Sequence, residues 1–322
     1  MQIQTLSLVV GTAACDADCP FCVSKMTGFG ELPDSPLLNQ AHLRKAIALA
    51  KMGGCTTALI TGKGEPTLYP SHIHDLLEAD LASAFPFIEL QTNGMILYKA
   101  LYGKHPKLTK LHLLRWLEGG LNTIAISSAG YIDSELHTAK HEALVELNAK
   151  HYGRGKGYLP MTMLVDGLHH LGFTVRLCVM AQKGGIDTIQ DVALQVTSAK
   201  RLGVDQLTIR PLTAPGTSNS VEASKYVQEH APECFNNHAP QIPGQSVDDT
   251  SVISKWASLR GTLLRRLQGG GEVYDIGGQN LGVYNCLTVD KDADLRSLIF
   301  YANGRLTYSW QHPGAVLLAG YE

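Results

Sequence analysis

Short apolar segments alternate with longer amphipathic segments through the first two thirds of the chain. This alternation constrains the fold more than any other feature of the sequence. The apolar segments predict strands over residues 4–10, 56–61, 87–92, 122–127, 173–180 and 205–210. The amphipathic segments predict helices over residues 39–52, 70–83, 106–119, 133–149, 161–171 and 187–202. Strands that alternate with helices in this way form a parallel sheet.

The predicted strands are continuous apolar runs, which are typical of strands buried on both faces of an α/β protein. Right-handed crossovers either curl six such strands into a (β/α)6 partial barrel or leave the sheet open. We predict the six-stranded parallel partial barrel. In both arrangements the active site lies at the carboxyl ends of the strands.

The character of the sequence changes after Pro211. Residues 211–250 are rich in Pro, Ser, Asn and Gly, which predicts an excursion or lid. We therefore place a core domain at residues 1–212 and a C-terminal extension at residues 213–322. The extension is expected to close the mouth of the barrel.

Two elements are predicted within the extension. Residues 251–268 have the pattern of a helix with a basic end. Residues 296–310 hold two strand-like runs around Asn303-Gly304, a strong signal for a β-hairpin. Tyr308, Trp310 and His312 follow the hairpin. An ordinary packing face on the hairpin is favoured for them, and the lining of a pocket is the alternative.

The composition describes a protein with a sizeable core and little net charge. The chain has 322 residues, of which 44% are apolar and 17% charged, and its net charge is −2. This balance argues against disorder and provides no overall field for nucleic acid or an anionic membrane. No apolar run approaches the ~18–20 residues of a membrane span, and no Lys or Arg precedes the apolar start as an export signal requires. We therefore expect a cytoplasmic protein that binds neither membrane nor bulk nucleic acid.

Three of the seven cysteines crowd into eight positions after the first predicted strand, as Cys15-Asp-Ala-Asp-Cys19-Pro-Phe-Cys22. The odd count and the crowding suit a reducing compartment and metal binding better than paired disulfides. Three thiolates in one loop can hold one face of an iron–sulfur cube and leave one iron open to another ligand. A zinc site is the alternative, but structural zinc takes four ligands in paired spacings. The nearest candidates for a fourth ligand, Cys55 or a histidine, are distant in sequence.

The cysteine loop resembles the signature of the radical S-adenosylmethionine (SAM) superfamily, C-x3-C-x2-C, with the aromatic Phe21 before the last cysteine. Gly62-Lys63-Gly64-Glu65-Pro66 follows the second strand and is similar to the family's Gly-Gly-Glu-Pro motif, which meets the amino group of SAM. Glycines allow backbone approach, while carbonyls and a carboxylate accept hydrogen bonds from an ammonium group. The sequence departs from the motif at Lys63, which replaces the second glycine. Gln91-Thr92-Asn93-Gly94 resembles the family's Thr-Asn-Gly.

The remaining strand ends extend this resemblance over residues 4–212. The fourth strand ends near Ser127, where relatives carry a serine that contacts SAM, and the fifth and sixth strands resemble those that border the cofactor. The resemblance implies cluster ligands at Cys15, Cys19 and Cys22. It implies SAM contacts at Phe21, Gly62, Gly64, Glu65, Pro66, Thr92, Asn93, Ser127, Val179, Ile209 and Arg210.

The resemblance also implies the cofactors and the reaction. A [4Fe–4S] cluster binds SAM at its open iron and donates one electron to the sulfonium. The C–S bond then breaks to give methionine and a 5′-deoxyadenosyl radical, which abstracts hydrogen from the substrate. The protein supplies positioning and excludes water. A reductant protein such as flavodoxin or ferredoxin is the implied partner.

Within the superfamily, the core is similar to the group that contains the GTP cyclase of molybdenum-cofactor biosynthesis. That enzyme uses three C-terminal cysteines to hold a second cluster. Here only Cys234 and Cys286 lie beyond residue 212, and they are far apart. We therefore predict neither a second cluster nor that specific activity.

The sequence leaves the substrate and the substrate-side catalytic residue open. We favour a small molecule or nucleotide, because residues 150–156 form a basic, glycine-rich loop that suits anions. A radical SAM enzyme that modifies a peptide or protein is the alternative, and an activase that forms a glycyl radical on a partner protein is a further one. The rival from another class is a zinc-holding, non-catalytic binding protein, for which the strand-end matches would be coincidence.

Overall fold

The computed structural model describes residues 2–27, 37–79, 81–103, 105–152, 159–216, 218–235, 252–267, 271–283, 295–310, 312 and 314–321. All six predicted strands are present, each within one residue of its predicted bounds. They are β1 (Thr5–Val10), β2 (Thr57–Gly62), β3 (Phe87–Thr92), β4 (Thr123–Ser128), β5 (Thr174–Ala181) and β6 (Gln206–Pro211).

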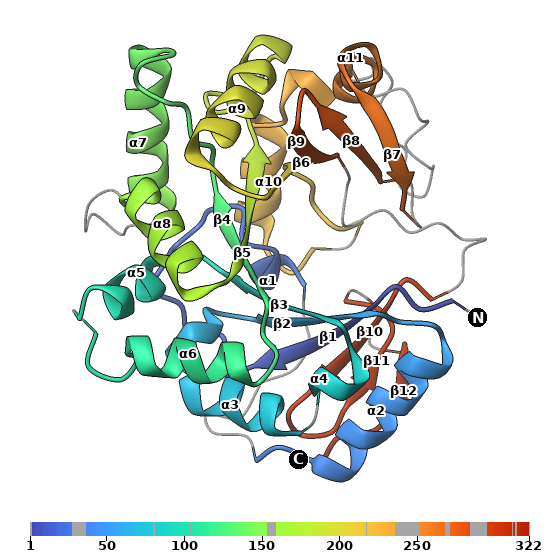
Figure 1. Ribbon diagram of the computed structural model, residues 1–322. Coiled ribbons are helices and arrows are strands. Elements are labelled where there is room, and N and C mark those ends of the chain that lie inside the picture. Colours follow the sequence, from blue (N-terminus) through green and yellow to red (C-terminus); the bar gives the residue numbers. More distant parts are fainter. Residues whose placement is uncertain are drawn as a thin grey trace.

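These six strands lie side by side in chain order and run parallel. The parallel set continues on both sides, because β10 (Ser297–Tyr301) pairs with β1 and β9 (Gln279–Val283) pairs with β6. The predicted count of six strands is therefore too low, since two strands of the C-terminal extension join the same sheet. Figure 1 shows this α/β arrangement, with β1 and β2 in the lower half and β5 and β6 in the upper half.

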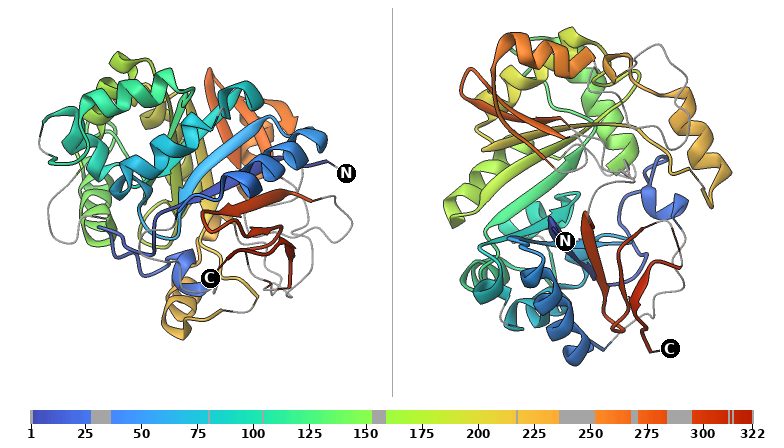
Figure 2. Two further views of the ribbon diagram at one scale, coloured as in Figure 1. Left: turned by 90° about the horizontal axis from the view of Figure 1, so that it is seen from below. Right: turned by 90° about the vertical axis from the view of Figure 1, so that its right-hand side faces the viewer.

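Antiparallel strands form both edges of the described sheet. β11 (Leu306–Thr307) and β12 (Val316–Leu318) follow β10 at one edge, while β8 (Glu272–Ile276) and β7 (Thr262–Arg266) follow β9 at the other. In the right-hand view of Figure 2, the edge with β10–β12 lies below and the edge with β7–β9 lies above. The C-terminal extension thus contributes to the sheet at both ends.

The predicted hairpin is confirmed. β10 and β11 pair antiparallel, and Gly304 in the turn between them has a φ of 86°, a conformation that glycine adopts readily. Trp310 packs against Ile299 and Tyr301 of β10, with its ring 6.4 Å from the Tyr301 ring. The predicted packing on the hairpin is therefore confirmed for Trp310, whereas Tyr308 and His312 are exposed.

The predicted helix over residues 251–268 is too long. Helix α11 spans Val252–Arg260, and the basic residues Arg265 and Arg266 lie on β7. The break falls at Gly261, where an added Cβ would lie 2.2 Å from the carbonyl oxygen of Asp275. Close backbone approach to β8 therefore ends the helix at this glycine.

The helices predicted from the sequence pack against one face of the sheet (Figures 1 and 2). Those predicted from the sequence are α2 (Gln40–Met52), α3 (Pro70–Glu78) with α4 (Leu81–Ala84), α6 (Lys110–Glu118), α7 (Thr138–Tyr152), α8 (Met161–Leu171) and α9 (Ile189–Leu202). Those not predicted are the short α1 (Val23–Met26), α5 (Met95–Leu101) and α10 (Val221–Glu229), with the 3-10 turns η1 (Pro66–Leu68) and η2 (Glu233–Phe235). No described helix is long and apolar enough to cross a membrane.

The two faces of β5 differ in polarity. On β5, Leu177 and Val179 have 0% exposure and belong to the main hydrophobic core, whereas Arg176 alternates with them. Because side chains alternate between faces along a strand, Arg176 lies on the face opposite the core. The prediction was burial on both faces, and in this part of the sheet the second face carries polar side chains that are largely buried.

A buried ion pair spans three strands on the polar face. The Arg176 guanidinium contacts the Glu89 carboxylate, and the Gln91 amide donates to the same carboxylate over 3.1 Å. Ala125 of β4 lies in register with Gln91 on one side and Arg176 on the other. The short alanine side chain leaves room for Arg176 to reach from β5 across β4 to β3.

Replacing Arg176 with methionine is expected to destabilise the fold strongly. The pair is only 14% and 8% exposed, and removing one member of a buried pair typically costs about 3–5 kcal/mol because the other charge loses its partner. Urea unfolding measures the loss. The Arg176→Met, Glu89→Gln double variant is expected to recover much of it, and an Arg176→Met variant as stable as wild type would contradict the assignment.

Candidate functional site

The three clustered cysteines occupy the loop that follows β1. Cys15, Cys19 and Cys22 are free thiols of intermediate exposure. Cys22 precedes the one-turn helix α1, and its backbone N–H donates to the Cys19 carbonyl oxygen over 3.2 Å. The segment between Cys19 and Cys22 therefore forms a tight turn.

The end of α7 supports the middle of this loop. The carbonyl oxygen of His151 accepts the Asp18 N–H at 3.2 Å and the Cys19 thiol at 3.4 Å. On the exposed side, the Lys25 ammonium contacts the Asp18 carboxylate at 2.9 Å. The loop is thus held on both sides, and within it the Cys15 sulfur accepts the Ala17 N–H over 3.4 Å.

The thiols are close enough to influence one another's ionisation. Burial raises the pKa of Cys19 to about 12, and the neighbouring Cys22 and Cys15 act in the same direction. Burial also raises the pKa of Cys15, with smaller contributions from Glu65, Asp16 and Cys22. A bound metal reverses this balance because it deprotonates a coordinating thiol outright.

Among the described residues, no three His, Cys, Asp or Glu side chains converge on a point where a single metal ion would bind. An iron–sulfur cube is held differently, with thiolates distributed over its iron atoms.

The turn after β2 packs directly on the cysteine loop. The Glu65 N–H donates to the Ala14 carbonyl oxygen over 2.9 Å. At Gly64 an added Cβ would lie 1.9 Å from that same oxygen, so only glycine fits this approach. Gly62 ends β2, and Pro66 begins the turn η1.

The Gly64→Ala variant is expected to separate the turn from the cysteine loop. The atom met by the new Cβ is backbone, so relief requires movement of the chain, and overpacking of this kind typically costs about 1–3 kcal/mol. Thermal unfolding and the iron content of the reconstituted protein both report the change. The Gly216→Ala variant is a suitable control, because an added Cβ there meets nothing within 4 Å.

The Glu65 side chain connects the ends of β2 and β3. Its carboxylate is buried and accepts four hydrogen bonds over 2.6–3.0 Å, from the N–H and hydroxyl of Thr67, the Thr92 hydroxyl and the Asn93 N–H. Burial raises the pKa of Glu65, and the same hydrogen bonds oppose that rise. We take the carboxylate as the operative form, because all four partners donate to it. Glu65 and Thr92 therefore fix the local backbone.

Asn93 connects the end of β3 to the cysteine loop. Its side-chain amide donates to the Asp16 carboxylate over 2.7 Å and accepts the Met95 N–H over 3.0 Å. The second carboxylate oxygen of Asp16 is buried without a hydrogen-bond partner. Sequence reasoning missed Asp16, although its position between Cys15 and Cys19 was a usable signal.

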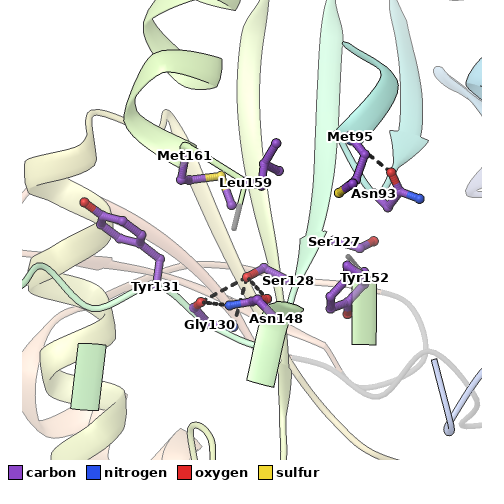
Figure 3. Close-up of a pocket in the computed structure, with 10 residues that line it drawn as sticks. All are labelled: Asn93, Met95, Ser127, Ser128, Gly130, Tyr131, Asn148, Tyr152, Leu159 and Met161. Carbon is purple, nitrogen blue, oxygen red and sulfur yellow. Dashed lines mark hydrogen bonds between the residues drawn. The ribbon is translucent and has the colours of Figure 1, made fainter. Parts of the chain in front are cut away.

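Ser127 lies in a pocket at the ends of β3 and β4, beside Asn93 (Figure 3). In the same pocket the Ser128 hydroxyl donates to the Gly130 carbonyl oxygen over 3.0 Å, and the Asn148 amide donates to that oxygen over 2.9 Å. This network ties the end of β4 to α7. The pocket is lined by Asn93, Met95, Ser127, Ser128, Gly130, Tyr131, Asn148, Tyr152, Leu159 and Met161.

Phe21, within the cysteine loop, is buried against two aromatic rings. Its ring lies 5.2 Å from the His151 ring and 6.1 Å from the Tyr226 ring of α10. Burial lowers the pKa of His151 to about 4, with Lys150 and His230 acting in the same direction. The imidazole is therefore neutral near pH 7, and Phe21 rests on an uncharged surface.

Lys63 replaces the second glycine of the Gly-Gly-Glu-Pro pattern. Its side chain reaches the segment that follows Cys22. Its ammonium is buried and donates to the carbonyl and hydroxyl oxygens of Thr27, each over 3.0 Å. Burial lowers the pKa of Lys63 to about 8, while the nearby Cys22 opposes that change. The ammonium also lies 5.9 Å from the centre of the Trp310 ring.

The other predicted contacts lie on β5 and β6. Val179 and Ile209 have 0% exposure and belong to the hydrophobic core. Arg210 follows Ile209 and lies in register with Met180 of β5. Residues 153–156 of the predicted basic loop (150–156) lie outside the described residues. Cys286 and residues 236–250, the second part of the predicted excursion, lie outside them as well.

No protein-family model matches the sequence, and the search of curated proteins gave no match. Solved structures with a similar fold include methylornithine synthase (PylB), at 13% identity and a TM-score of 0.43, covering 68% of this chain and 56% of that one. A radical SAM methyltransferase from Sphaerobacter thermophilus matches at 18% identity and a TM-score of 0.41, covering 69% and 62%. Coproporphyrinogen III oxidase (HemN) from Escherichia coli, described as a radical SAM enzyme, matches at 12% identity and a TM-score of 0.37, covering 86% and 65%. Each match spans less than two thirds of the solved chain.

Proposed function

We propose that this chain is a radical SAM enzyme that cleaves SAM reductively and abstracts hydrogen from a substrate. The proposal rests on one main observation, which is that three strand-end segments meet at one place. The Glu65 N–H contacts Ala14, and the Asn93 amide contacts Asp16. The cysteine signature, the Gly-Glu-Pro turn and the Thr-Asn-Gly turn therefore form one continuous surface.

The residues at this surface suit both cofactors. Cys15, Cys19 and Cys22 would hold a [4Fe–4S] cluster and leave one iron without a protein ligand. The partnerless Asp16 oxygen and the carbonyls of the β2 turn are acceptors for an ammonium group such as that of SAM. When bound, the cluster and SAM would supply one-electron cleavage of a C–S bond and a 5′-deoxyadenosyl radical.

The chain's own residues position the cofactors and exclude water. Glu65 and Asn93 fix the backbone, and Ser127 borders the same site from β4. Tyr226 and Trp310 reach this region from the C-terminal extension. These contacts support a core of residues 1–212 that forms a partial barrel, with residues 213–322 covering its mouth.

For the substrate we propose a small molecule or nucleotide with polar groups. Support comes from the polar face of the strands, where Glu89, Gln91 and Arg176 form a connected set. Polar side chains on a concave surface give orientation to a small ligand. We propose a flavodoxin or ferredoxin as the electron donor.

The proposal is tested on protein purified without oxygen and reconstituted with iron and sulfide. We expect about four iron and four sulfide per chain, and 5′-deoxyadenosine after SAM and a strong reductant are added. Stoichiometric zinc, a colourless protein and intact SAM would instead support a zinc-holding binding protein.

A further inference from the structure

The Lys63 ammonium lies beside the segment that follows Cys22, the third proposed cluster ligand. Lys63 follows β2 within the turn that contacts the cysteine loop, and its ammonium donates twice to Thr27 at the end of α1. That helix is a single turn that starts directly after Cys22. Lys63 therefore reaches the segment of the third cysteine from the side of β2.

The Lys63 ammonium is shielded from solvent. Lys63 is 8% exposed, and its ammonium lies over the Trp310 ring. Cys22 interacts electrostatically with this ammonium. Charge–charge interactions at such a site are strong, because little solvent screens them.

The geometry points to Lys63 as a positioning residue that stabilises the reduced form of the cluster; this inference rests on the proposed function. A [4Fe–4S] cluster on three thiolates carries net negative charge, and reduction adds one more. A buried cation nearby favours the more negative state, since net charge and hydrogen bonding set the potential of such clusters. Glycine at this position, as in the family's motif, would provide no such charge.

Lys25 is a matched control on the other side of the same segment. It also interacts electrostatically with Cys22 and Cys19, but its side chain is 46% exposed and paired with Asp18. Solvent and the paired carboxylate reduce its effect on the cluster. Variants of the two lysines therefore allow a buried charge to be compared with an exposed charge beside the same cysteine.

The test is a redox titration of the reconstituted cluster, followed by electron paramagnetic resonance. In Lys63→Gln, which keeps a donor for Thr27, the ratio of reduced to oxidised cluster at a fixed potential is expected to fall about tenfold, or about 59 mV for a one-electron couple. Lys63→Arg and Lys25→Gln are expected to stay within about twofold of wild type. Thr27→Val removes an anchoring contact but keeps the charge, and is expected to leave the potential unchanged.

The outcomes separate charge from structure. An unchanged potential in Lys63→Gln, or equal shifts in Lys63→Gln and Thr27→Val, would overturn the inference. If Lys63→Gln holds less iron than wild type, Lys63→Met fills a similar volume without charge and takes its place. A wild-type protein that forms no cluster would overturn the proposed function and this inference together, whereas a normal wild-type cluster with no Lys63 effect would overturn the inference alone.

Discussion

The Cys22→Ser variant is expected to lose the cluster and, with it, all cleavage of SAM. Serine is a poor ligand for iron, and only three cysteines are clustered to hold the cube. We expect iron content to fall to less than about a tenth of wild type, because the two remaining thiolates hold too few of the iron atoms. Iron and sulfide analysis with quantification of 5′-deoxyadenosine measures the effect.

The control for this variant is Cys234→Ser. Cys234 is also a free cysteine and is buried, but it lies on η2 and its backbone contacts Asp187 rather than the cysteine loop. It is expected to retain the full iron content. Retention of iron and of SAM cleavage by Cys22→Ser would remove Cys22 from the site.

The Glu65→Ala variant is expected to destabilise the fold by about 3 kcal/mol or more, since each buried donor left without an acceptor costs about 1–3 kcal/mol. The N–H groups of Thr67 and Asn93 both lose their acceptor in this variant. The end of β3 would loosen, and with it the contact between Asn93 and Asp16. Urea unfolding of the unreconstituted protein measures the stability change without any contribution from metal.

Glu65→Gln is the matched variant for this prediction. The amide oxygen keeps an acceptor for one set of donors, while its NH2 group faces a former donor. We therefore expect a smaller loss of stability than in Glu65→Ala. Equal stability of Glu65→Ala and wild type would show that these four hydrogen bonds do not organise the site.

The parallel core could be predicted from sequence because its elements are local. β1 to β6 are short apolar runs, and α9 carries a capping box formed by Thr188 and Asp191 and ends at Gly203 with a φ of 81°. By contrast, α5 is largely buried, with Met95, Ile96 and Leu97 in a row, and has no helical periodicity to detect.

The long-range pairings could not be predicted. β10 lies beside β1 although Ser297 and Thr5 are nearly the whole chain apart. β9 includes Asn280 and Gly282, so it lacks the apolar run that identified the other strands. Their positions depend on open sheet edges that exist only once the core has folded.

At the site, the sequence predicted which segments meet but not what their side chains do. The contact of Glu65 with SAM stays a prediction, but the hydrogen bonds that its carboxylate accepts from neighbouring turns were not predicted. The contact of Lys63 with Thr27 was not predicted either. Both outcomes depend on the distance between two loops, which neither loop encodes alone.

The most direct test of the proposed function is electron paramagnetic resonance of the reduced, reconstituted protein before and after addition of SAM. If three cysteines hold the cube and SAM binds the remaining iron, the spectrum of a reduced [4Fe–4S] cluster appears and changes when SAM is added. A cluster spectrum that SAM leaves unchanged, or the absence of any cluster signal, would contradict the account.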